Sequence, residues 1–352
     1  MDIKDSMART LSSWMKVEGP NGDIVLGTRV RLARNVVGIP FPATAKKEQL
    51  RHLLDISEGL VSELSSVEKF TFLKMAEVDS LERQLLVEKH LISPSHIHNT
   101  STKGLLLGEN EDTSIMINEE DHFRIQVLFP GLQLESAWRK ANKVDDVIEE
   151  KVDYAFDMER GFLTACPTNV GTAMRASVMV HLPALTRVNQ LKRMLTTITQ
   201  FGLVVRGLYG EGSESSGNIY QISNQVTLGH SEEEIIDHLQ RITSQVLTGE
   251  RKAREYLLES ERRLQIEDMV HRSFGILTNA RIITSKEAMS LLSDVRLGID
   301  LGLIKDLDKD ILKQLMVLIR QAHLQKFMGQ NLPSEERDRL RAALIRGKLL
   351  NK

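Results

Sequence analysis

Apolar residues in the first two thirds of the chain occur in short runs that turn-forming residues separate. Residues 105–107 and 114–117 flank the polar turn 108–112, which predicts a β-hairpin. Apolar residues at three-to-four spacing predict helices elsewhere in this part of the chain. Further strands are expected at 123–129, 161–165, 203–208 and 219–223, and helices at 46–66, 132–156 and 183–201. This pattern predicts an α+β fold in which helices pack on a sheet.

The pattern changes after Gly229. Ser231 followed by the acidic residues 232–234 is typical of a capped helix start, and from there to Leu350 nearly every segment has helical periodicity. A chain of 352 residues is long enough for two domains, because single cores usually stop growing at about 250–300 residues. We therefore expect a domain over residues 1–259 and an all-α domain over 260–352.

Composition limits the classes of function. A formal net charge of −2 gives the chain no general attraction to nucleic acid or to acidic membranes, so neither is an expected partner. The first residues contain no apolar signal core, and no run approaches the ~20 apolar residues of a membrane span, so we expect a cytoplasmic protein. Cys166 is the single cysteine, which excludes an internal disulfide and leaves a buried filler or a reactive thiol.

Two arginines alternate with apolar residues near the start of the chain. Arg29 and Arg31 project from the same face if residues 27–31 form a strand, and two forked guanidinium groups side by side suit phosphate oxygens. The alternative is a solvent-exposed strand face. The chain has neither the G-x-x-x-x-G-K-[ST] loop nor the H-R-D and D-F-G motifs, so a nucleotide would have to be held in another way.

Four short blocks occur in a characteristic order. They are G-T-R-V-R at 27–31, N-E-E-D-H-F-R at 118–124, A-C-P-T-N-V-G-T-A-M-R-A-S at 165–177 and V-R-G-L-Y-G-E at 205–211. With these blocks the chain resembles the phosphagen (ATP:guanido) kinase family, and within it the bacterial protein-arginine kinases of the McsB type. The resemblance implies a phosphagen-kinase-like catalytic domain, with an antiparallel sheet flanked by helices, followed by an all-α C-terminal domain.

The resemblance also implies how ATP is held. In this family arginines replace a glycine-rich loop around the phosphates, and the matching positions here are Arg29, Arg31, Arg124, Arg175 and Arg206. In-line phosphoryl transfer depends mainly on positioning and charge neutralisation, which such a cluster supplies. Mg²⁺ is expected to arrive with the nucleotide, without a dedicated protein metal site. His90 matches a histidine that stacks on adenine, although a surface helix histidine is the alternative.

The acceptor site needs carboxylates, because a guanidinium is a poor nucleophile until it is oriented and loses a proton. By resemblance, Glu120 is the general base and Glu211 is a second carboxylate that clamps the substrate. Cys166 matches the family thiol beside the same guanidinium, where neighbouring arginines are expected to favour the thiolate. Taken alone, the acidic run at 118–121 reads as a solvated turn, and the glycines around Glu211 as a flexible hairpin.

The layout favours a protein as the acceptor. Small-molecule phosphagen kinases carry a helical domain ahead of the T-R-V-R block that helps to enclose the free substrate, whereas here the block follows about two dozen residues. We therefore expect an open acceptor site that admits an arginine side chain of a protein. The alternatives are a kinase of free arginine or another small guanidino compound, and a nucleotide-binding adaptor without turnover.

A last candidate motif lies near the C-terminus. Arg337, Asp338 and Arg341 lie in a predicted helix that begins near Ser334, with the two arginines one turn apart. The segment resembles an R-D-x-x-R-A motif that binds phosphoarginine as an allosteric signal in McsB-like kinases. The alternatives are a solvated, salt-bridged helix and a weak nucleic-acid-binding patch. The resemblance further implies a zinc-binding activator protein, a stress-response transcriptional repressor as substrate, a Clp-type protease and a homodimer.

Overall fold

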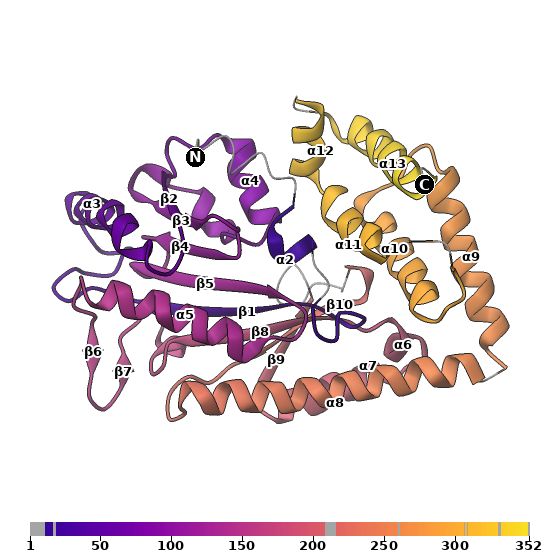
Figure 1. The fold of residues 1–352 in the computed structure, drawn as a ribbon, viewed down its shortest axis with the longest axis horizontal. Coiled ribbons are helices and arrows are strands. Elements are labelled where there is room, and N and C mark those ends of the chain that lie inside the picture. The colour runs from indigo at the N-terminus through magenta and orange to yellow at the C-terminus, as the bar shows by residue number, and fades with distance from the viewer. Residues whose placement is uncertain are drawn as a thin grey trace.

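The structure is a computed structural model that describes residues 11–16, 19–207, 216–259, 261–305, 307, 309–329 and 332–350. Its centre is an eight-stranded sheet with strand order β2-β3-β4-β5-β1-β8-β10-β9 (Figure 1). All neighbouring strands in it are antiparallel. The strands are β1 (Val25–Arg34), β2 (Phe70–Lys74), β3 (Gly104–Gly108), β4 (Thr113–Ile117), β5 (Phe123–Pro130), β8 (Met174–His181), β9 (Leu203–Gly207) and β10 (Ile219–Asn224).

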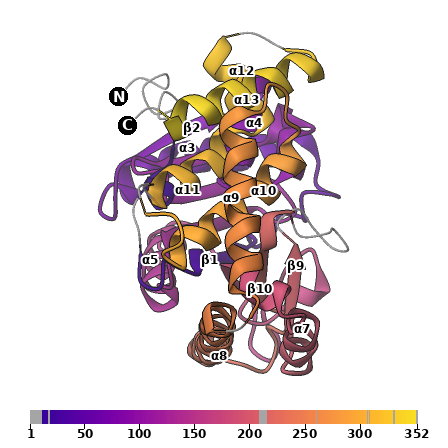
Figure 2. The same cartoon turned by 90° about the vertical axis from the view of Figure 1, so that its right-hand side faces the viewer.

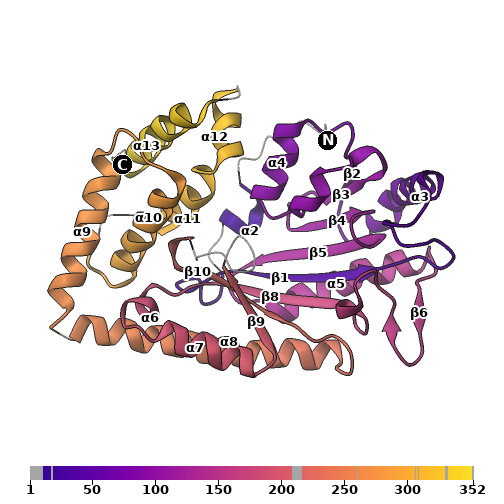
Figure 3. The ribbon, with the colours of Figure 1, turned by 180° about the vertical axis from the view of Figure 1, so that it is seen from behind.

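Three long helices cover one face of this sheet: α3 (Lys47–Leu64), α5 (Leu134–Glu149) and α8 (Glu232–Glu259). α5 and α8 run along the sheet in Figure 1, and the view from behind in Figure 3 shows α6 (Pro183–Arg187) and α7 (Leu191–Gln200) beside α8. α8 begins as its sequence predicts, because Ser231 and Glu234 form reciprocal side-chain to backbone hydrogen bonds of 3.2 and 3.0 Å.

The alternation of side chains along the strands places basic residues on the sheet face opposite the three helices. In β1 the side chains of Val30 and Leu32 are buried in the core beneath the helices. Arg29 and Arg31, which alternate with them, are half-buried on the opposite face. In β5, Arg124 likewise lies between the buried residues Phe123 and Ile125. The face away from α3, α5 and α8 is therefore lined by basic side chains.

The C-terminal helices are α9 (Arg263–Asn279), α10 (Ser285–Asp300), α11 (Lys309–Leu318), α12 (Gln321–Met328) and α13 (Ser334–Leu350). Most of their buried apolar side chains form a cluster of their own. These helices pack at one end of the sheet, with α9 foremost in the turned view of Figure 2 and α12 beside α4 (Ser80–Glu88) in Figure 1. Within the described ranges, no helix has the length and apolar character needed to span a membrane.

The predicted α+β class, antiparallel sheet and all-α C-terminal part are confirmed, whereas three element boundaries were wrong. The helix expected over 183–201 is two helices, because Asn189 between them has a left-handed φ of 58°. The helix expected over 132–156 ends at Glu149, since Tyr154 leaves it to bridge Val36 and to donate to Asp145 at 2.9 Å. The strand expected at 161–165 is only β7 (Gly161–Phe162), which pairs with β6 (Phe156–Asp157).

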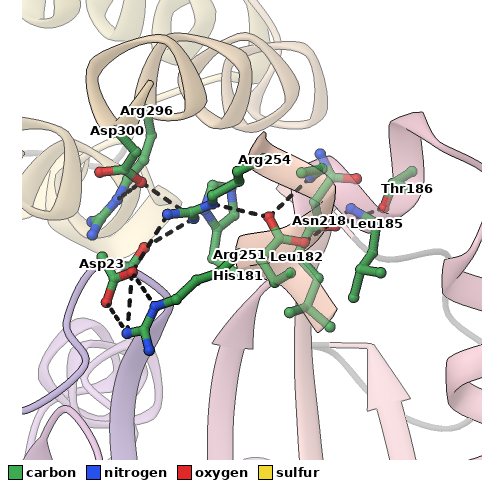
Figure 4. Close-up of polar contacts among 12 residues, drawn as sticks. Asp23, His181, Leu182, Leu185, Thr186, Asn218, Arg251, Arg254, Arg296 and Asp300 are labelled. Carbon is green, nitrogen blue, oxygen red and sulfur yellow. Dashed lines mark hydrogen bonds and ion pairs between the residues drawn. The ribbon is translucent and has the colours of Figure 1, made fainter. Parts of the chain in front are cut away.

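A group of mostly buried charged side chains connects the C-terminal helices to the eight-stranded sheet (Figure 4). Arg254 of α8 donates to Glu250 at 3.2 Å, and its guanidinium lies 3.4 Å from Asp300 of α10 and 3.6 Å from Asp23 before β1. Glu250 also accepts the backbone N–H groups of Ala184 and Leu185 at the start of α6. Burial raises the pKa of Glu250, with Arg254 acting against that rise. Arg254 thus pairs with two buried carboxylates, of which Asp300 also lies 3.8 Å from Arg296.

Replacing Arg254 with methionine is expected to lower the free energy of unfolding by about 3–5 kcal/mol, because it leaves the buried carboxylate of Glu250 without its ion-pair partner. Urea unfolding followed by circular dichroism measures this difference. Arg272→Met is the matched control: its ion pair with Asp268 is exposed, so the change should stay within about 0.5 kcal/mol. Equal losses in the two variants would contradict the role given to Arg254.

Candidate active site

A cleft of about 850 Å³ lies between the basic face of the sheet and the C-terminal helices. The sheet contributes Arg29, Arg31, Arg124 and Arg206 to its lining. The opposite wall comes from residues at the ends of α10, α12 and α13, including Arg320 and Arg337. The cleft therefore brings together four of the five predicted phosphate-binding arginines and the C-terminal motif.

Strand register brings the five predicted arginines together. Arg31 of β1 lies directly opposite Arg175 of β8, and directly opposite residues of an antiparallel pair point to the same face. Arg124 and Arg206 come from β5 and β9, so the cluster spans most of the sheet's width. Like charges facing each other destabilise a sheet, which indicates a site that is completed by an anion.

The pKa shifts within the arginine cluster also indicate an anionic ligand. Burial, followed by the nearby guanidinium groups of Arg124 and Arg175, lowers the pKa of Arg29 to about 10, so Arg29 stays charged at neutral pH. The pKa of Arg31 is lowered well below its ordinary value, again by burial first and then by Arg29, Arg124 and Arg175. A bound polyanion such as a triphosphate would offset the repulsion among these guanidinium groups.

Glu120 and Cys166 lie in adjoining loops that one buried carboxylate connects. Asp121 Oδ1 accepts the backbone N–H of Ala165 and the side-chain amide of Asn35, both at 2.7 Å. The segment that carries Cys166 is thereby fixed next to the turn that carries Glu120. The Glu120 side chain is exposed, and partial desolvation raises the pKa of its carboxyl, with Arg124 opposing that rise. A raised carboxyl pKa suits a proton acceptor at neutral pH.

Cys166 is half-buried at the start of the 3₁₀ turn η3 (Pro167–Asn169), and its Sγ lies 3.0 Å from Thr168 Oγ1. Because it is only partly buried, Cys166 is not core filler. Glu211, the second predicted carboxylate, lies outside the described residues, as does the rest of 208–215.

His90 follows α4 directly and lines the cleft together with the arginines, so it is not a remote surface histidine. Its backbone has a left-handed φ of 60°, and its ring makes an edge contact with Trp14 at a centroid distance of 5.9 Å. Burial, then Arg320 and Arg29, lower the pKa of His90 well below its ordinary value. The imidazole is therefore neutral, as a ring that stacks on a base would be.

Comparison with known proteins decides the family. Residues 48–253 match the ATP:guanido phosphotransferase C-terminal catalytic domain, and residues 263–352 match the protein-arginine kinase McsB C-terminal domain. The chain is 53% identical to the protein-arginine kinase of Halothermothrix orenii, over 99% of both chains. It is 52% identical to that of Bacillus subtilis, over 99% of this chain and 96% of the relative. The chain belongs to the protein-arginine kinase family.

Solved structures of ATP:guanido kinases have a similar fold. A lombricine kinase matches with a TM-score of 0.59 and 22% identity, over 67% of this chain and 68% of the other. The duplicated taurocyamine kinase from Schistosoma mansoni, solved with transition-state analogue components, matches with a TM-score of 0.61 and 26% identity, over 71% of this chain and 37% of the other. The phosphagen-kinase-like fold predicted from the four blocks is confirmed.

Several residues that orient this kinase's site were not predicted from the sequence. Gln221 accepts a hydrogen bond from Arg29 at 2.9 Å, and Ser223 accepts one from Arg175 at 3.4 Å. Glu119 pairs with Arg124, whereas the side chain of the adjacent Glu120 is exposed. The polar positions 221 and 223 do alternate with apolar neighbours in β10, and this alternation was the available signal.

The C-terminal motif lies on α13 and faces the same cleft. Arg337 donates to the backbone carbonyl of Leu332 at 2.8 Å and lines the cleft. Arg341 is buried and donates to the carbonyl oxygens of Ile319 and Ile283 at 2.8 and 3.0 Å, while also pairing with Asp338. Arg341 therefore also has a structural role between the C-terminal helices, and Arg337 is the less constrained of the two arginines.

Proposed function

We infer that this chain is a protein-arginine kinase, which transfers the γ-phosphoryl group of ATP to the guanidinium of arginine side chains in proteins. The observation that carries this conclusion is similarity over nearly the full length to proteins of that name, including the C-terminal helices. The cluster of arginines on one face of the sheet supplies the chemistry that such a reaction requires.

We propose that Arg29, Arg31, Arg124, Arg175 and Arg206 hold the triphosphate. Among the described residues, the acidic ones that line the cleft are Glu88 and Asp338, and both carboxylates already accept hydrogen bonds from protein groups. Mg²⁺ therefore fits best when it is bound through phosphate oxygens and water. When bound, it neutralises charge on the transferred phosphoryl group.

In the proposed reaction a guanidinium nitrogen attacks the γ-phosphorus, an N–P bond forms and the bond to the bridging oxygen of ADP breaks. Glu120 accepts the proton that the guanidinium loses. Glu211 is proposed as the second carboxylate that orients the acceptor, and Cys166 as a positional and electrostatic contact that forms no covalent bond. Phosphoarginine and ADP are the products.

The test is incubation with MgATP and an arginine-bearing protein, with phosphorus NMR in acid and in base. An arginine N–P bond is labile in acid and stable in base, which distinguishes it from a phosphate ester. We expect phosphoarginine on the protein and a higher kcat/KM than with free arginine. Equal or better use of free arginine would favour the small-molecule alternative, and absence of turnover would favour the adaptor.

We propose further that residues 1–259 form the catalytic domain and 260–352 a helical domain, with Arg337, Asp338 and Arg341 as a phosphoarginine site. Support comes from α8 ending at Glu259 and from the shared cleft. We also propose that the protein acts in the cytoplasm as a homodimer formed through the helical domain. Its proposed partners are a zinc-binding activator, a transcriptional repressor and a Clp-type protease. In this proposal phosphoarginine marks proteins during stress.

Arg337→Ala is expected to abolish binding of free phosphoarginine, because it removes the guanidinium that faces the cleft. Calorimetry measures the dissociation constant. Arg339→Ala is the matched control, since Arg339 lies on the same helix with its side chain exposed. Unchanged phosphoarginine binding in Arg337→Ala would eliminate this site.

A further inference from the structure

Glu88 at the end of α4 connects the catalytic sheet to the start of α12, and its side chain is buried. Its Oε1 accepts the backbone N–H of Ala322 at 2.9 Å, and its Oε2 accepts the backbone N–H and the Nδ1 of His323 at 3.1 and 2.7 Å. Because the first N–H groups of a helix have no partner within the helix, this carboxylate caps α12 from another part of the chain.

The same contact places a residue of the C-terminal part in the cleft. Arg320, immediately before α12, donates to the backbone carbonyl of Glu88 at 3.2 Å and lines the cleft with His90. The guanidinium is close enough to His90 to help lower the pKa of its imidazole, after the larger effect of burial. The C-terminal helices thus contribute directly to the end of the cleft where His90 lies.

The backbone between Glu88 and His90 is held from both sides. Lys89 pairs with the buried Glu111 at 2.9 Å, and the carbonyl of His90 accepts the side-chain amide of Gln126 at 2.8 Å. His90 itself adopts a left-handed φ of 60°, which is uncommon for a residue other than glycine. Its position therefore depends on these neighbouring contacts and not on a regular helix.

We propose that Glu88 is a positioning residue for the nucleotide base: by docking α12 onto α4, it holds His90 and Arg320 at one end of the cleft. Imidazole and guanidinium groups are planar and stack on aromatic bases, so this end suits the purine while the arginine cluster holds the phosphates. The inference rests on the proposed function and on the placement of the adenine beside His90 that the family resemblance implies.

Glu88→Gln tests the proposal. Three donors converge on the two carboxylate oxygens, so an amide in either orientation leaves at least one of them without an acceptor. The dissociation constant for ATP is expected to rise about tenfold, as for the loss of a hydrogen bond to a buried charge. The dissociation constant for inorganic tripolyphosphate, which has no base, should not change. Both are measured by calorimetry.

Glu82→Gln is the control, because Glu82 is also on α4 and pairs with Lys326 of α12, but at 3.7 Å and with both side chains about one-third exposed. It should leave both dissociation constants unchanged. Equal weakening of ATP and tripolyphosphate in Glu88→Gln, or no change in either, overturns the inference. His90→Ala separates the placement of the base from the role of Glu88. If His90→Ala leaves the dissociation constant for ATP unchanged, the base does not lie beside His90. If His90→Ala raises that constant while Glu88→Gln does not, only the role of Glu88 is wrong.

Discussion

Glu120→Gln should lower kcat by about 10²–10⁴-fold and leave the dissociation constant for ATP nearly unchanged, because it removes the proton acceptor but keeps the arginine cluster. The Glu120 side chain is exposed and close enough to Arg124 and Arg31 for both to act on its pKa, whereas its neighbour Glu119 is bound to Arg124 and cannot take over the role. Steady-state kinetics with an arginine-bearing protein and calorimetry with nucleotide measure the two quantities. Glu77→Gln, at an exposed position away from the cleft, should change neither.

The pH dependence gives a second test of Glu120. A general base acts only when it is deprotonated, so kcat/KM should fall as the pH decreases through the pKa of Glu120. Desolvation raises that pKa, which places the acidic limb of the profile above the pH expected for an ordinary glutamate. The limb should disappear in Glu120→Gln. A variant that retains more than a third of wild-type turnover would show that another group accepts the proton.

The face of the sheet that carries the site was predictable, because strand alternation is a local property. Arg29 and Arg31 were placed on one face from their spacing alone, and the structure has them there. That Arg31 faces Arg175 depends on strand register, which pairs residues far apart in the sequence and has no local signal. Only the resemblance to a known family predicted that Arg175 belongs with Arg31.

Residues that act through tertiary contacts were missed for the same reason. Asp121 holds the segment of Cys166, and Glu88 caps α12 more than two hundred residues away in the chain. In the sequence both are ordinary acidic residues near a turn or helix end. The two helices at 183–201 show a local limit as well, since apolar spacing continues across Asn189 and only its left-handed backbone separates them.

Arg31→Met should lower kcat/KM for ATP by roughly 10³-fold without destabilising the apo protein. Arg31 is a phosphate-binding residue in the proposed site, so its loss removes charge stabilisation in the transition state. In the apo protein, however, burial and three neighbouring arginines already disfavour its charge, as the lowered pKa indicates. A linear apolar side chain relieves this repulsion, so the melting temperature of the apo enzyme should stay the same or rise.

The loss of kcat/KM together with an unchanged melting temperature distinguishes a role of Arg31 in nucleotide binding from a role in stabilising the sheet. Arg31→Lys retains the charge but not the fork, and it should recover part of the nucleotide affinity. Arg51→Met, at an exposed position on α3, should change neither kinetics nor melting temperature. At an ATP concentration that saturates the wild type, the melting temperature of the wild type should rise more than that of Arg31→Met, because the variant binds ATP more weakly and gains less binding energy in the folded state. If Arg31→Met instead melts several degrees lower yet binds ATP normally, Arg31 stabilises the sheet and a different group holds the phosphates.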